Sequence, residues 1–309
     1  MNNIVITGGA GFIASHLAKS LESKYDRIYL IDSLVRTSTL RNITHLLKND
    51  KYVFIEADVA DFDFTSLPDI KEVYHLAAIR INRCVQFPAE GHKSIADSGM
   101  NIVRYCAENN IKLFFASTAS VYNNPKRFPI METDPCEPHT IYGAGKYYTE
   151  GLIRSFAKSH NLSYSICRFF SVYGPNMDCE GAYTEIVYNW LSSVKAGSNK
   201  ITVYGNPDEK ILDLVYVEDV VNAILAVSKN WPNDVFNVST EEGISISELI
   251  KVIEEQLEVS LNITILPENR TDIENKRVGS VSKLKQLGWS PNSTISEGIK
   301  KTYQWIQTL

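Results

Sequence analysis

The chain has 309 residues, enough for one large domain or for a main domain with a smaller lobe. Hydrophobic residues make up 44% of the sequence and charged residues 22%, and the formal net charge is −5. Because no basic cluster stands out, we expect no nucleic-acid partner. Every apolar run is far shorter than the ~18 residues that would suggest a membrane span, so we expect no membrane association.

The N-terminus and the cysteines bear on location. An apolar segment, Ile4 to Ile6, begins almost at the first residue and leaves no room for a signal peptide. Five cysteines are scattered along the chain without metal-ligand spacing: Cys84, Cys106, Cys136, Cys167 and Cys179. We therefore expect reduced cysteines, no metal site and a cytoplasmic protein.

Residues 1–170 alternate short apolar segments with amphipathic ones. Strands rich in β-branched or aromatic residues are predicted over 3–7, 27–32, 52–58, 72–78, 113–118 and 163–170. Amphipathic helices are predicted over 12–23, 95–109 and 142–160. This alternation predicts an α/β protein with a Rossmann-like, doubly wound parallel sheet.

The pattern loosens after residue 170. Further helices are predicted over 182–196, 218–229, 245–257 and 295–307, and short strands over 201–204, 214–217 and 235–238. No linker separates two lobes. We expect residues 1–170, with interleaved segments near 211–240, to form the main domain, and about 171–210 and 241–309 to form a smaller C-terminal α/β lobe.

A glycine-rich turn joins the first predicted strand to the first predicted helix. Gly8 and Gly11 can adopt a positive φ, and their missing Cβ atoms let a pyrophosphate approach the backbone at a helix N-terminus. Asp32 follows at about the spacing of an acid that binds the adenosine ribose diol. A carboxylate there repels a 2′-phosphate and favours NAD over NADP, although Arg36 nearby weakens that preference. The alternatives are a plain tight turn and an ordinary acid at a strand end.

Tyr142 and Lys146 are four residues apart and share one face of a predicted helix. A phenol with a pKa near ~10 is a poor base at neutral pH, and lowering that pKa to near neutrality takes roughly 4 kcal/mol. A neighbouring Lys and a cationic nicotinamide ring together could supply this. Such a Tyr can take a proton from a hydroxyl while a hydride leaves the same carbon. The pair alone is weak evidence, but about 130 residues after a dinucleotide-type loop it is strong.

Together these motifs resemble the extended short-chain dehydrogenase/reductase superfamily, in particular the NAD-dependent nucleotide-sugar epimerases and dehydratases. The resemblance runs nearly end to end. It is carried by residues 7–14, 56–59, 75–78, 115–122, 142–146, 168–175, 213–219, 235–238 and 287–289.

The resemblance implies a bound NAD, a nucleotide-diphosphate-sugar substrate in the C-terminal lobe and a homodimer formed through the helices at 95–109 and 142–160. It implies that Thr118 bonds the reacting oxygen, that Tyr142 is the general base, and that Lys146 holds the nicotinamide ribose and depresses the Tyr142 pKa. His75 is expected to be structural. Substrate contacts are expected from Thr118, Ser171 and Arg270. The implied cofactor contacts are Gly8, Gly11, Phe12, Ile13, Asp32, Ser33, Arg36, Thr37, Asp58, Val59, Leu76, Ala77, Ala78, Arg80, Ala116, Tyr142, Lys146 and Phe169.

The residues after Thr118 favour one reaction. Family dehydratases usually carry Asp-Glu there, whereas Ala119 and Ser120 cannot do that proton work. The segment looks most like that of the UDP-glucose and UDP-N-acetylglucosamine 4-epimerases, which oxidise C4 transiently and return the hydride to the opposite face. A nucleotide-sugar dehydrogenase, reductase or dehydratase remains an alternative, as does a non-catalytic NAD(P)-binding sensor.

Two departures concern the substrate diphosphate. The family Arg before Asp213 is Leu212 here, and a family Asn is Ser171. Losing a charge-assisted Arg–phosphate contact removes about 1.5–3 kcal/mol unless something replaces it. The resemblance still implies a phosphate contact from Arg270, which matches a later family Arg. Lys210, Arg80 and Arg83 are candidates for the replacement, and a different nucleotide sugar or an altered pose is the other explanation.

Overall fold

The computed structural model describes residues 1–122, 125–179, 185–268 and 276–309. Its centre is a seven-stranded sheet in the order β11-β6-β5-β4-β1-β2-β3, with every pair parallel. The strands are β1 Asn3–Thr7, β2 Arg27–Asp32, β3 Tyr52–Glu56, β4 Ile70–His75, β5 Lys112–Thr118, β6 Tyr164–Phe169 and β11 Asp234–Val238. The predicted Rossmann-like, doubly wound fold is confirmed.

Two strands differ from their predicted bounds by two residues or more at one or both ends. The strand predicted over 52–58 ends at Glu56, and the one predicted over 72–78 spans Ile70–His75. Leu76, Ala77 and Ala78 leave the sheet and line a cavity instead. Their apolar character, which suggested strand continuation, serves that cavity wall.

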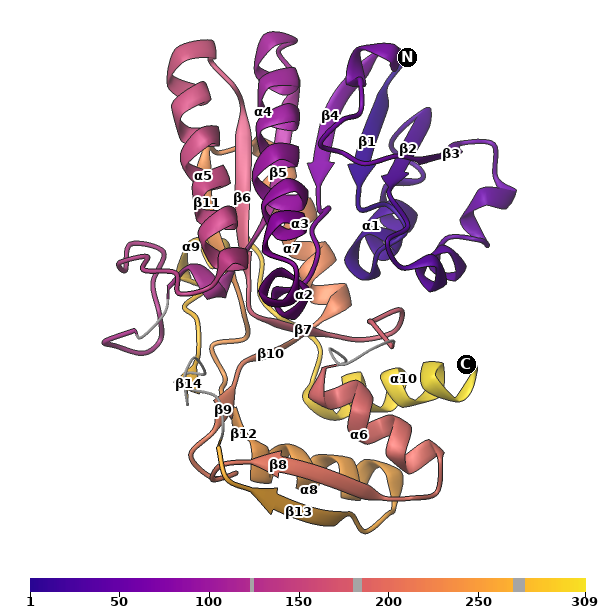
Figure 1. Cartoon of the computed structure of the whole chain (residues 1–309), viewed down its shortest axis with the longest axis vertical. Helices are drawn as coiled ribbons and strands as arrows, with labels where there is room; N and C mark the ends of the chain where they lie inside the picture. The colour runs from indigo at the N-terminus through magenta and orange to yellow at the C-terminus, as the bar shows by residue number, and fades with distance from the viewer. Residues whose placement is uncertain (123–124, 180–184, 269–275) are drawn as a thin grey trace.

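Helices cover both faces of the sheet. Successive residues of a strand point to opposite faces, and the apolar residues of β1 therefore need packing partners on both. Ile4 and Ile6 of β1 pack with α1 (Phe12–Leu21), α7 (Val217–Asn230) and α9 (Ser282–Gln286). Val5 packs on the other face with α4 (Ser98–Glu108) and α5 (Ile141–His160). Figure 1 shows α4 and α5 side by side along this face.

Short helices fill the connections. The helix predicted over 95–109 is in fact a π-helix, η4 (Lys93–Asp97), continued by α4. Not predicted were α2 (Ile81–Gln86), α3 (Pro88–His92) and the 3₁₀ turns η1 (Thr37–Asn42), η2 (Leu46–Lys48), η3 (Phe64–Ser66) and η5 (Ala119–Val121). These segments are too short to show a helical repeat of apolar residues.

The C-terminal part builds a smaller lobe below the sheet (Figure 1). Its helices α6 (Ile186–Lys195), α8 (Ile246–Leu257) and α10 (Ile295–Gln307) enclose a separate apolar cluster around Trp190, Leu249 and Ile299. Residues 182–184 of the helix predicted over 182–196 lie outside the described residues. In contrast, α7 and β11, from the interleaved segment, pack with the main sheet.

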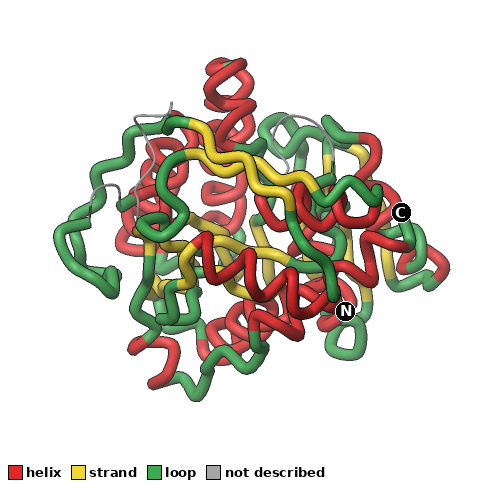
Figure 2. Tube along the Cα trace, turned by 90° about the horizontal axis from the view of Figure 1, so that it is seen from below, coloured by secondary structure: helices red, strands yellow, loops and turns green. Residues whose placement is uncertain are grey.

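The lobe's strands form three small sheets. β7 (Ser171–Tyr173) pairs with β10 (Leu214–Tyr216), and β8 (Lys200–Tyr204) pairs with β13 (Asn262–Leu266), which Figure 2 shows side by side from below. The third sheet has the order β12 (Ile244–Ser245), β9 (Ile211–Leu212) and β14 (Lys276–Arg277).

All five cysteines are free thiols. Within the described ranges no helix is long and apolar enough to cross a membrane.

Candidate active site

A cavity of about 750 Å³ lies at the carboxyl ends of the parallel strands, where the chain after β1 and the chain after β4 turn to opposite faces of the sheet. Every cofactor residue predicted from the sequence lines it except Thr37, and so do Thr118 and Ser171. Arg270 lies outside the described residues. The structure thus gathers residues that are up to about 160 positions apart in the sequence.

The glycine turn leaves room for a phosphate at the start of α1. Gly8 has φ +66°, and a Cβ added there would lie 2.9 Å from the backbone of Ala77. Gly11 is the N-cap of α1, so no side chain caps the first backbone N–H groups of the helix. The first turn also contains no acidic residue. The backbone N–H groups of this helix end can therefore bind a dinucleotide pyrophosphate.

Asp32 stands at the end of β2 beside this turn. Its carboxylate accepts hydrogen bonds from the backbone N–H groups of Ala10 (3.1 Å) and Leu34 (2.9 Å). Burial raises the pKa of Asp32, and these two hydrogen bonds oppose that shift. A carboxylate has about four acceptor sites, so Asp32 can also accept from the hydroxyls of a ribose.

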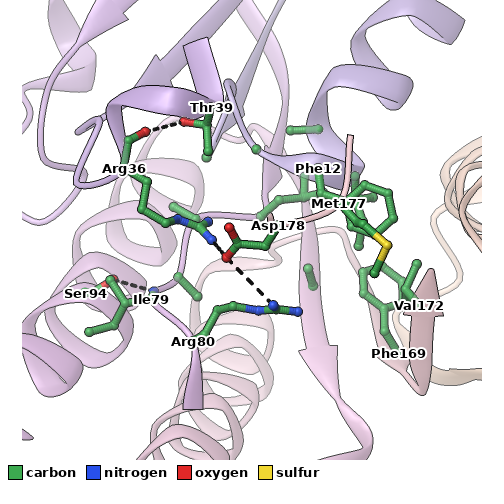
Figure 3. Close-up of a pocket in the computed structure, with 18 of the residues that line it drawn as sticks. Phe12, Arg36, Thr39, Ile79, Arg80, Ser94, Phe169, Val172, Met177 and Asp178 are labelled. Atoms are coloured by element: carbon green, nitrogen blue, oxygen red, sulfur yellow. Dashed lines mark hydrogen bonds and ion pairs between the residues drawn. The ribbon is translucent and has the colours of Figure 1, made fainter. Parts of the chain in front are cut away.

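Two arginines of the cavity share one carboxylate that the sequence analysis missed. Figure 3 shows Arg36 and Arg80 directed at Asp178 from opposite sides. Arg36 Nη1 contacts the Asp178 carboxylate, and Arg80 Nη1 lies 3.7 Å from the same carboxylate. Arg80 Nη2 also lies 2.5 Å from the Glu185 carboxylate. Because the Asp178 carboxylate offsets the charge of Arg36, the presence of Arg36 no longer favours a cofactor that carries a 2′-phosphate.

Thr118, Tyr142 and Lys146 meet where β5 ends against α5. Thr118 Oγ1 accepts a hydrogen bond from the Ser120 backbone N–H (3.1 Å), and Lys146 Nζ donates one to the Ala116 carbonyl (2.8 Å). Lys146 Nζ lies 6.0 Å from the centroid of the Tyr142 ring. All three side chains line the cavity.

A glycine allows this close approach of helix and strand end. A Cβ on Gly143 would lie 2.5 Å from the Ser120 carbonyl oxygen. Any larger residue would push α5 away from η5. The glycine next to Tyr142 therefore sets how near the phenol lies to Thr118.

The chain's own groups do not make Tyr142 a strong base. Burial raises the pKa of Tyr142, opposed by the charge of Arg80 and by a hydrogen bond with Thr118. Burial also lowers the pKa of Lys146 from 10.5 to about 7. Because burial disfavours the protonated form of Lys146, Lys146 offers Tyr142 less positive charge than an exposed Lys would. A cationic nicotinamide ring beside the phenol would supply the missing positive charge.

His75 and Cys84 lie close to these residues but belong to the packing. The His75 ring is buried, stacks on Phe115 and shares a 2.7 Å hydrogen bond with Thr7 Oγ1, in keeping with the structural role expected for it. Burial lowers the pKa of His75 to about 3, so the ring is neutral. Cys84 is fully buried and does not line the cavity.

A buried ion pair behind Thr118, Tyr142 and Lys146 was not predicted from the sequence. Glu150, one helical turn after Lys146, accepts two hydrogen bonds from Arg168 of β6 (2.9 and 2.7 Å) and one from Ser117 of β5 (2.6 Å). Arg168 also donates to the Tyr122 hydroxyl (2.8 Å). The spacing of Glu150 from Lys146 was the available signal, but its partner Arg168 lies on another element.

The candidate diphosphate cations occupy different places. Arg80 and Arg83 line the cavity, whereas Lys210 does not and instead pairs with Glu268 at 2.5 Å. Leu212 packs against the apolar cluster of the C-terminal lobe. Arg277, which the sequence analysis did not single out, lines the cavity from β14.

A doubly wound sheet, a glycine turn at its switch point and a Tyr-Lys pair on one helix face define a dinucleotide-dependent enzyme of the short-chain dehydrogenase/reductase type. The sequence profile of the "NAD dependent epimerase/dehydratase family" matches residues 4–239. The chain belongs to this family.

The relatives are named for more than one reaction. A UDP-glucose 4-epimerase of Lactobacillus helveticus is 27% identical over 98% of this chain and 96% of its own length. UDP-glucuronic acid decarboxylase 1 of Arabidopsis thaliana is 28% identical over 96% of this chain and 68% of its own length.

Solved structures agree along the whole chain. The UDP-N-acetylglucosamine 4-epimerase of Methanobrevibacter ruminantium (27% identical) superposes with a TM-score of 0.92 and covers 99% of this chain and 98% of its own. The UDP-glucose 4-epimerase of Thermotoga maritima (30%) has a TM-score of 0.90, with 99% of both chains covered. The UDP-glucuronic acid 4-epimerase of Bacillus cereus (25%, TM-score 0.90, 99% of both chains) was solved with NAD and UDP-glucuronic acid. The cofactor of this family member is NAD.

Proposed function

We propose that this chain is an NAD-dependent 4-epimerase of nucleotide-diphosphate sugars. The proposal rests on the presence of Thr118, Tyr142 and Lys146 at one cavity. Directly after Thr118 the chain has Ala119 and Ser120 instead of a second acid and base. Ala119 is buried in an apolar cluster, so it also presents no polar group to a substrate. This set supports oxidation and reduction at one carbon and leaves elimination of water without its catalysts.

Each residue has one task in the proposed reaction. Thr118 donates a hydrogen bond to the reacting C4 oxygen, and Tyr142 takes the proton of that hydroxyl. Lys146 binds the nicotinamide ribose. NAD bound here would supply the hydride acceptor and donor at C4, and hydride return to the opposite face requires the 4-keto sugar to turn over in the pocket. Tyr142 then returns the proton, so hydride and proton both balance over one turnover.

The cofactor residues support this placement. The α1 N-terminus would hold the pyrophosphate, Asp32 the adenosine ribose, and Asp58 and Val59 would lie near the adenine, while Leu76, Ala77 and Ala78 line the path toward Tyr142. Glu185 and Asp178, the acids on the lobe side of the cavity, both pair with Arg80.

The test is a labelled-substrate assay on protein purified with its NAD. UDP-glucose, UDP-N-acetylglucosamine and UDP-glucuronic acid, each deuterated at C4, are incubated separately and the products are analysed by NMR. We expect a 4-epimer that keeps its deuterium at C4, with NAD still bound to the protein. Stoichiometric release of NADH would establish a dehydrogenase instead, and release of CO₂ from UDP-glucuronic acid would establish a decarboxylase.

A further inference from the structure

A nucleotide-diphosphate sugar brings two phosphates into the cavity, so the cavity must offer a cation on the substrate side; this step rests on the function proposed above. The cationic side chains that line the cavity among the described residues are Arg36, Arg41, Arg80, Arg83, Lys146 and Arg277. Arg36 and Arg41 belong to the segment after β2, beside Asp32, which is the dinucleotide end. Arg80 pairs with the carboxylates of Asp178 and Glu185, and Arg83 pairs with Glu90. Lys146 donates a hydrogen bond to the Ala116 carbonyl beside Tyr142.

Arg277 differs from these because it comes from the C-terminal lobe. It lies on β14, whose parallel neighbour is β9, and its register partner on β9 is Leu212. Paired residues on adjacent strands point to the same face of a sheet and are about 4.8 Å apart. On that shared face Leu212 packs against the apolar cluster of the lobe, and the longer side chain of Arg277 extends to the cavity.

The register that brings these two residues together is fixed by a buried carboxylate. Asp213, which follows Leu212 and is 1% exposed, accepts a hydrogen bond from the Gly279 backbone N–H at 3.2 Å. The Gly279 carbonyl in turn accepts one from Ser239 Oγ at 2.6 Å. These hydrogen bonds fix the backbone at Gly279, which is two residues after Arg277.

This position adjoins the predicted sugar site. Gly279 packs against the ring of Phe170, and Phe170 and Ser171 both line the cavity. A nucleotide sugar with its C4 at Tyr142 and its nucleotide in the C-terminal lobe must cross this boundary with its diphosphate. A guanidinium can donate two parallel hydrogen bonds to a phosphate, which a leucine cannot.

We infer that Arg277 binds the substrate diphosphate, and that the cation absent at position 212 is supplied from the neighbouring strand. This explains how Leu212 is accommodated without loss of charge in the cavity. It also identifies Arg277 as a residue for ligand affinity, separate from the Tyr142 chemistry.

The test is calorimetric titration of UDP into the NAD-loaded protein. Arg277→Met should weaken UDP binding by at least ~10-fold, as expected for loss of a charge-assisted contact. Its KM for the turned-over sugar should rise while kcat changes little. Lys276→Met is the matched control, because Lys276 is the adjacent strand residue and its Nζ lies 4.9 Å from the Phe128 ring instead of lining the cavity.

A double variant that moves the arginine from β14 to β9 makes the test sharper. The double variant Leu212→Arg with Arg277→Leu should recover most of the lost UDP affinity, because the guanidinium then returns to the same face from β9. Equal NAD content and melting temperature in all variants show that they are folded. Wild-type UDP affinity in Arg277→Met, with epimerase activity present, would overturn this inference and leave the proposed function intact. Absence of both UDP binding and turnover in the wild-type protein would overturn both.

Discussion

Lys146 is buried and Tyr142 is half-buried, and desolvation raises the pKa of Tyr142 and lowers that of Lys146. Desolvation favours the neutral form of both, so the pair alone has little driving force to form phenolate. The positive charge of a bound nicotinamide ring would offset this desolvation of the Tyr142 phenolate. At the scale of one residue, this couples the basicity of Tyr142 to the presence of NAD.

The residue-scale prediction concerns that phenol. Tyr142→Phe should retain NAD and lower turnover at least ~100-fold, because it removes the general base and leaves the cavity shape unchanged. NAD content is measured from absorbance after denaturation, and turnover with the sugar found active in the deuterium assay. Tyr148→Phe, at a residue of the same helix that is 47% exposed, is the control and should keep full turnover. Near-normal turnover in Tyr142→Phe would contradict the assignment.

Three elements are joined behind the site by Glu150. It connects α5 to Arg168 of β6 and to Ser117 of β5, the residue that precedes Thr118. Burial raises the pKa of Glu150, but hydrogen bonds from Arg168 and Ser117 and the charge of Arg168 more than offset this, and the pKa lies below 4.5. The pair thus fixes the end of β5 against the helix that carries Tyr142 and Lys146.

The element-scale prediction is that Glu150→Gln lowers the free energy of unfolding by about 3–5 kcal/mol, since it leaves the Arg168 guanidinium buried without a counter-charge. Urea denaturation measures this. Arg154→Gln is the control: Arg154 is half-exposed and pairs with the same carboxylate at 3.2 Å, and its loss should cost no more than about 1 kcal/mol. A loss of less than about 1 kcal/mol in Glu150→Gln would show that the pair is not needed.

The contribution of Glu150 to the free energy of unfolding should depend on pH. Because the folded-state pKa of Glu150 is depressed, the unfolded protein binds its proton first as the pH falls. The stability that this carboxylate contributes is complete above its ordinary pKa of 4.5 and is lost as the pH falls through the lower folded-state value. The difference between wild type and Glu150→Gln should be constant between pH ~6 and ~8 and shrink below pH ~4.5. A difference that grows on acidification would contradict it.

At the scale of the whole molecule, α4 and α5 carry several exposed apolar or aromatic side chains. Met100, Ile141, Tyr147 and Tyr148 are between 36% and 47% exposed. Clustered exposed apolar residues mark interaction surfaces. They lie on the two helices through which the family resemblance implies a homodimer.

At this scale we predict a dimer in solution. Sedimentation equilibrium should give twice the mass of the chain, and Met100→Glu combined with Tyr148→Glu should give the monomer mass, because the charges would be buried at the interface. Ile265→Glu is the control: Ile265 is 58% exposed on β13 of the C-terminal lobe, and its change should leave the dimer intact. A monomeric wild type at micromolar concentration would refute the homodimer.

The sequence predicted the main sheet well because its signals are local. Each central strand is a short apolar run between turn residues, and α10 begins and ends at the predicted residues, Ile295–Gln307. Two-residue strands such as β9, β12 and β14 carry no such signal, so they escaped prediction. The domain boundaries and the contacts of each site residue with ligands stay predictions.

The sequence by itself determined the glycine turn, the acid at the end of β2 and the Tyr142–Lys146 pair, because backbone freedom at glycine and the helical repeat act between near neighbours. Only the tertiary structure placed Arg36 and Arg80 on Asp178, Arg168 on Glu150, and Arg277 beside Leu212. These contacts join residues on separate elements, and strand register and packing, not spacing along the chain, bring them together. For that reason the sequence indicated the proposed chemistry, whereas the position of the cation for the substrate could be inferred only from the folded chain.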